Sequence, residues 1–147
     1  MALRAAAASA PHAVIVFLGD NVYPSGMPDS AAPTRAAAER RLMQALRVVR
    51  ASGARGFLVP GNHDWDSMQP GGWDAVLRQE RFIAAAGGGP ALLPAGGCPG
   101  PAVVDVGAVV RSATSTASRR STAPGSRAAP ADSCASSSCA TAAPGWA

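Results

Sequence analysis

The chain lacks lysine altogether and has only two histidines and three cysteines among its 147 residues. The cysteines are Cys98, Cys134 and Cys139. No two of them form a CxxC pair, and no histidine is spaced to complete a zinc site with them. Their odd number does not fix the redox compartment. No apolar run is long enough to cross a bilayer, so the sequence predicts no membrane span.

Large aliphatic side chains are absent from the last quarter of the chain. From Arg111 to Ala147 there is no Val, Ile, Leu, Met or Phe, and Trp146 is the only large apolar residue. Such a segment cannot bury enough apolar surface to offset the entropy of ordering it. We therefore predict that residues 111–147 form a disordered Ala/Ser/Arg-rich tail and that the ordered domain ends near residue 110.

The positive charge of the chain is sparse. The tail contains four arginines and one aspartate, which gives it +3 of the formal net charge of +4. Basic residues are not interleaved with aromatic ones, and the first 110 residues are nearly neutral. The charge therefore gives no specific signal for nucleic-acid binding.

The first ten residues superficially resemble a signal peptide, with one arginine and a small-residue end. Their apolar stretch is short and consists only of alanine. A cytoplasmic location is therefore favoured over export.

The pattern of apolar residues in the first half predicts a βαβ unit. Residues 13–18 and 56–59 are apolar runs, the first closed by Gly19-Asp20 and the second by Pro60-Gly61, which suits buried strands. Between them apolar residues recur at helical spacing, and Ser52-Gly53 supplies a helix stop. The helix positions are Ala38, Leu42, Ala45, Leu46 and Val49.

The pattern continues less clearly towards residue 110. A second helix is predicted from Trp73 to Ala86, with Arg78, Glu80 and Arg81 on a solvated face. Valines between 103 and 110 predict a third strand of the sheet. The predicted fold class is α/β, with a parallel sheet and flanking helices.

Polar residues follow both predicted strands. Asp20 comes just after the first strand and Asn62 just after the second. The carboxyl ends of parallel strands share one edge of a sheet, and adjacent strands lie about 4.8 Å apart. Side chains from the two ends can thus converge on a metal pair, with Asp20 as a bridging carboxylate and Asn62 as a neutral oxygen ligand. His63 would then reach the substrate, with Asp64 orienting its ring.

Two strings in these positions resemble a known family. FLGDNVYPSG and VPGNHDW are similar to the second and third signature blocks of the calcineurin-like metallophosphoesterase superfamily, and GDNVY is similar to the GDxxY block of purple acid phosphatases. The resemblance implies a phosphoric ester hydrolase that uses metal-bound hydroxide and two Fe, Mn or Zn ions. It implies that Asp20 bridges the ions, Tyr23 binds the first ion, Asn62 binds the second, and His63 lies near the phosphoryl group.

The family pattern is incomplete in this chain. No Asp-x-His block precedes Asp20, and the later histidine blocks are absent. His12 lies eight residues before Asp20, about 26 Å away along a strand, so it cannot replace them. We interpret residues 1–110 as a partial, truncated metallophosphoesterase domain, an incomplete form of the family's four-layer β-sandwich. The expected function is that of a metal-dependent phosphoesterase fragment with weak or no activity; the alternative is a non-catalytic remnant that binds at most one metal ion or a partner protein.

Overall fold

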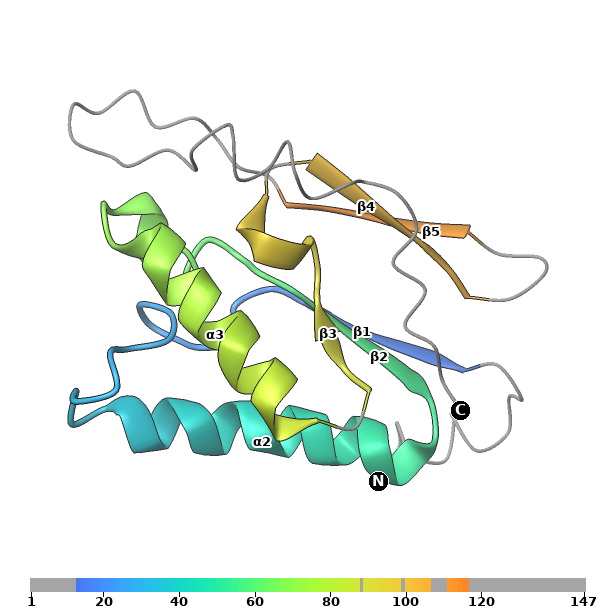
Figure 1. Cartoon of the computed structure of the whole chain (residues 1–147), viewed down its shortest axis with the longest axis horizontal. Helices are drawn as coiled ribbons and strands as arrows, with labels where there is room; N and C mark the ends of the chain where they lie inside the picture. The colour runs from blue at the N-terminus through green and yellow to red at the C-terminus, as the bar shows by residue number, and fades with distance from the viewer. Residues whose placement is uncertain (1–12, 88, 99, 107–110, 117–147) are drawn as a thin grey trace.

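The computed structural model describes residues 13–87, 89–98, 100–106 and 111–116. These residues form a mixed α/β structure with a small parallel sheet (Figure 1), which confirms the predicted α/β class with a parallel sheet and flanking helices. The elements follow the order β1 (Val14–Leu18), α2 (Arg35–Ser52), β2 (Arg55–Val59), the 3-10 helix η1 (Asp66–Met68), α3 (Gly72–Ala86), β3 (Ala91–Leu92), the 3-10 helix η2 (Ala95–Gly97), β4 (Gly100–Asp105) and β5 (Arg111–Thr116).

A parallel sheet with the strand order β1-β2-β3 forms the centre of the structure. Val14 pairs with Arg55 and Leu18 pairs with Val59, so β1 and β2 are in register over their whole length. With α2 between them, these strands make the predicted βαβ unit. Because both strands end at the same pair, the loops that follow them leave from one edge of the sheet.

Helix α2 packs on β2 through the apolar face whose residue spacing predicted the helix. Its buried residues are Ala38, Leu42, Leu46 and Val49. Gly56 of β2 allows this close approach, since a Cβ atom there would lie 2.5 Å from a methyl group of Val49. The helix ends at Ser52, as predicted, because Gly53 adopts a left-handed φ of 70°.

The core joins both helices, the sheet and the loop after β1. Val22 and Met27 of that loop are 2% and 0% exposed, although the surrounding loop is rich in Pro, Ser and Gly. The buried cluster consists of Val22, Met27, Ala38, Leu42, Leu46, Leu58, Trp65, Val76, Ile83 and Leu92. The loop is therefore held by apolar anchors at the edge of the sheet where β1 ends.

The third strand of the sheet differs from the prediction. It is β3, only two residues long, which pairs with β2 at Phe57 and Leu58. The valine-rich segment instead contributes β4, which pairs antiparallel with β5. In Figure 1, β1 and β2 lie between α2 and this β4–β5 hairpin. The prediction that the valines near residues 103–110 form the third strand of the parallel sheet was therefore wrong. The actual third strand, β3, was missed because two residues are too few to show a strand pattern in the sequence. Residues 107–110 lie outside the described part of the chain.

The predicted tail is described only at its start. Arg111–Thr116 form β5, and residues 117–147 lie outside the described residues. In the part of the chain that the structure describes, no helix is long and apolar enough to cross a membrane.

Candidate functional site

The residues predicted to form the site lie in two neighbouring loops. The first loop, residues 19–23, follows β1 and contains Asp20 and Tyr23; the second loop, residues 61–64, follows β2 and contains Asn62, His63 and Asp64. Parallel pairing of Leu18 with Val59 places both loops at the same sheet edge. The structure therefore brings the two sequence blocks together.

Two glycines allow the loops to touch through their backbones. A Cβ atom on Gly19 would lie 2.9 Å from the Cα atom of Gly61. A Cβ atom on Gly61 would collide with the carboxylate of Asp20 and lie 2.5 Å from its backbone nitrogen. Both sites therefore require a residue without a side chain.

Asp20 is joined directly to the second loop. Its Oδ1 atom accepts a hydrogen bond from the backbone N–H of His63 at 3.2 Å. The residue is exposed and has a φ of 50°, a left-handed conformation that costs an L-residue about 1–2 kcal/mol. An exposed carboxylate held in a costly conformation is a feature of functional sites.

The His63 ring contacts Tyr23 of the first loop and Pro24, the residue that follows this loop. Its Nδ1 atom lies 2.6 Å from the carbonyl oxygen of Pro24. Because a carbonyl oxygen only accepts, Nδ1 is assigned as the protonated nitrogen, and the neutral ring then has its lone pair on Nε2. The ring also packs on Tyr23, with 4.1 Å between the ring centroids and a tilt of 46°.

The Asp64 side chain is buried, whereas that of its neighbour His63 is partly exposed. Asp64 is 0% exposed. Its carboxylate accepts hydrogen bonds from the backbone N–H groups of Gly61 at 2.8 Å, Asn21 at 3.0 Å and Val22 at 2.9 Å, and from the Asn21 side-chain amide at 3.1 Å. Burial raises the pKa of Asp64, while the hydrogen bonds from Gly61, Asn21 and Val22 oppose that rise. The Asp64 carboxylate thus binds the two loops, whereas the imidazole that it was predicted to orient is held by Pro24.

The remaining predicted ligands, Asn62 and Tyr23, are exposed at the surface of the site. Tyr23 is 56% exposed, and Asn62 lies at the turn directly before His63. Within the described residues, no three or more His, Cys, Asp or Glu side chains are grouped so that they could hold a metal ion. His12 lies outside the described part.

A hollow of about 540 Å³ adjoins the first loop along β1 and α2. Asp20 and Tyr23 line one part of it, and Arg41 of α2 contributes a positive charge. Asn21 and Gln44 are further polar lining residues, and the apolar side chains of the wall include Leu18, which is 85% exposed. Arg41 was not predicted as a site residue, because its position on a mostly solvated arginine-rich helix gives no sequence signal.

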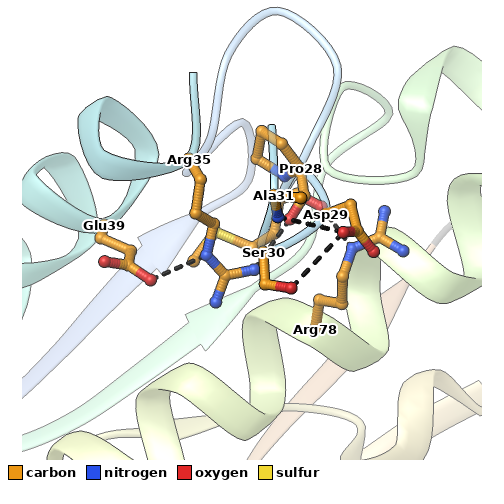
Figure 2. A network of polar contacts seen from close by, with 8 residues as sticks. Pro28, Asp29, Ser30, Ala31, Arg35, Glu39 and Arg78 are labelled. Atoms are coloured by element: carbon orange, nitrogen blue, oxygen red, sulfur yellow. Dashed lines mark hydrogen bonds and ion pairs between the residues drawn. The ribbon is translucent and has the colours of Figure 1, made fainter. Parts of the chain in front are cut away.

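The long loop after Tyr23 is anchored by two arginines (Figure 2). Arg78 of α3 donates from Nε to the carbonyl oxygen of Met27 at 2.8 Å, and Arg35 of α2 donates to that of Pro28 at 2.8 Å. Arg35 also forms an ion pair with Glu39 at 2.7 Å. These bonds fix the loop that supplies the Pro24 carbonyl to His63.

The prediction of a solvated face on α3 was partly wrong. Arg81 is exposed, but Arg78 bonds the loop and the Glu80 carboxylate accepts the backbone N–H of Gly96 at 2.9 Å. The partners, Met27 and Gly96, lie outside α3, and helical periodicity contains no information on such contacts.

Comparison of the chain with protein-family models, curated proteins and solved structures gives no match.

Proposed function

We propose that the chain acts as a metal-dependent phosphoesterase, a hydrolase of phosphoric esters, through the two loops at the ends of β1 and β2. The observation that carries the proposal is the contact between Asp20 and His63 across these loops. Through the His63 backbone, it places a carboxylate of the type that binds metal ions next to a residue whose ring is suited to proton transfer, at the sheet edge where α/β proteins bind ligands. The resemblance of both loops to metallophosphoesterase blocks supports the same reaction.

The donor types in the loops fit one divalent cation. Asp20 offers an exposed carboxylate, Asn62 an amide oxygen, and Tyr23 a phenolic oxygen, which are oxygen ligands suited to hard or borderline ions. They are too few for the full shells of two ions in this chain alone. When bound, the cation would polarise a phosphoryl oxygen and activate water for attack on phosphorus.

His63 is suited to the proton transfer that ester hydrolysis requires. Because Nδ1 donates to Pro24, Nε2 is the ring atom able to give or receive a proton. A protonated Nε2 can pass its proton to the oxygen of the leaving alcohol as the P–O bond breaks. Arg41 in the adjoining hollow favours an anionic group beside Asp20.

A second candidate is a non-catalytic remnant that binds one metal ion or a partner protein. The small number of donors favours it, since no group of three His, Cys, Asp or Glu ligands forms within the described residues. Such a protein would retain cation binding at Asp20 and Asn62 without turnover.

Hydrolysis of 4-nitrophenyl phosphate by the pure, untagged, Mn²⁺-loaded chain separates the two candidates. The phosphoesterase proposal expects turnover that both Asn62→Ala and His63→Ala reduce at least tenfold. Asp29→Asn, which removes an acid outside the site, serves as the control and should keep the activity. No turnover by the wild-type chain would support the remnant, and unaltered turnover in both site variants would place the activity elsewhere.

A further inference from the structure

The Asp64 carboxylate has a position that a purely catalytic role does not explain. It is fully buried, and its four hydrogen bonds come from residues on both loops. Gly61 belongs to the second loop, while Asn21 and Val22 belong to the first. One side chain therefore links the ends of two strands that are about forty residues apart in sequence.

The two linked segments adjoin the exposed functional groups. Asn21 directly follows Asp20, and Asp64 directly follows His63. A carboxylate that fixes the N–H groups of Asn21 and Val22 also limits where the Asp20 backbone can lie. That restraint acts on a residue whose φ of 50° requires support from its surroundings.

We infer that Asp64 is a positioning residue that sets the distance between the Asp20 carboxylate and His63, and that it does not itself contact the substrate. This inference rests on the proposed function for its consequence in the reaction. The four hydrogen bonds account for the burial of a charged group, which would otherwise be strongly unfavourable. An amide at position 64 would turn an NH₂ group towards the N–H donors and would break part of this arrangement.

Amide hydrogen exchange, measured by NMR on the metal-free full-length chain, tests the inference. The wild-type protein should protect the amide of His63, and Asp64→Asn should increase its exchange at least tenfold relative to that of Leu46 in α2. Loss of stability alone would accelerate both amides together. Asp29→Asn, with the same change of charge, should leave the ratio unaltered. An unprotected His63 amide in the wild type, or an unchanged ratio in Asp64→Asn, would overturn the inference.

A milder variant covers the case in which Asp64→Asn does not fold. Asn21→Ala removes one donor to Asp64 together with the bond from Asn21 to the Val59 carbonyl. The exchange ratio of His63 to Leu46 should again rise, by about threefold, and an unchanged ratio in this folded variant would overturn the inference.

Titration of the wild type and of Asp64→Asn with Mn²⁺ measures how the loss of the Asp64 carboxylate affects metal binding. Asp64→Asn should bind Mn²⁺ about tenfold more weakly than the wild type, as is typical when support of a ligand is lost. Equal affinity in a folded variant would refute the positioning role. If the wild type binds no Mn²⁺, the proposed function fails, and the exchange ratio alone decides whether Asp64 links the loops.

Discussion

The backbone N–H of His63 donates a hydrogen bond to the Asp20 carboxylate at 3.2 Å, although 43 residues separate the two along the chain. Parallel pairing of β1 with β2 brings the two loops to one edge, two glycines let them approach, and the Asp64 carboxylate accepts hydrogen bonds from both loops. We propose that Asp20 and His63 act on one ligand and that these three features hold them in place for it.

Replacing Gly61 by alanine should separate the loops. The added methyl group would collide with the Asp20 carboxylate, so we expect a loss of about 1–3 kcal/mol in the free energy of unfolding. Gly71→Ala is the control, because its nearest neighbour, an Asp66 carboxylate oxygen, is 3.9 Å away. Urea denaturation checks both variants, and equal stability of the two would contradict the close contact between the loops.

The neutral His63 ring should carry its proton on Nδ1. The Pro24 carbonyl, 2.6 Å from Nδ1, stabilises this tautomer over the alternative with the proton on Nε2. Long-range ¹H–¹⁵N NMR spectra above pH 8 distinguish the two forms by their nitrogen shifts. A ring protonated at Nε2 would show that Pro24 does not hold it.

Removing the Arg78 side chain should loosen the loop that supplies Pro24. Arg78→Ala loses a partly buried hydrogen bond to Met27, and we expect a loss of about 1–2 kcal/mol in the free energy of unfolding. Arg81→Ala, an exposed change on the same helix, should remain within about 0.5 kcal/mol of the wild type. Similar losses in both variants would mean that the bond to Met27 contributes little.

Acid should remove a small stabilising contribution of Asp29. The hydrogen bond from the Ala31 amide chiefly lowers the pKa of Asp29, aided by Ser30 and by the charges of Arg78 and Arg35. Since the folded pKa lies below the unfolded one, the contribution is present above the unfolded pKa and is lost as the pH falls through the folded pKa. The unfolding free energies of wild type and Asp29→Asn should therefore converge as the pH falls from neutral to below the folded pKa of Asp29. A difference that grows on acidification would contradict the lowered pKa.

The sequence predicted the helices and strands that contain several consecutive or regularly spaced apolar residues. The apolar spacing from Ala38 to Val49 and the glycine at 53 predicted α2 and its end, and the apolar runs predicted β1 and β2. The two-residue β3 and the pairing of β4 with β5 were missed, because strand pairing depends on partners elsewhere in the chain.

For the site too, the sequence predicted the features that follow from strand order but not the contacts of individual side chains. The predicted strand ends were enough to place Asp20 and Asn62 at one edge of the sheet, since parallel topology brings both loops there. The bonds of Asp64 to Asn21 and Val22 could not be predicted, because a carboxylate next to a histidine in sequence does not show which way it points. The bond from His63 to Pro24 was missed for the same reason.

Isothermal titration calorimetry of Mn²⁺ with the untagged wild-type chain and with Asp20→Asn measures whether the Asp20 carboxylate binds a metal ion. We expect one Mn²⁺ per chain and at least tenfold weaker binding when the Asp20 carboxylate becomes an amide, with Asp29→Asn equal to wild type. Absence of Mn²⁺ binding by the wild type, or equal affinity in Asp20→Asn, would contradict a metal site at the joined ends of β1 and β2.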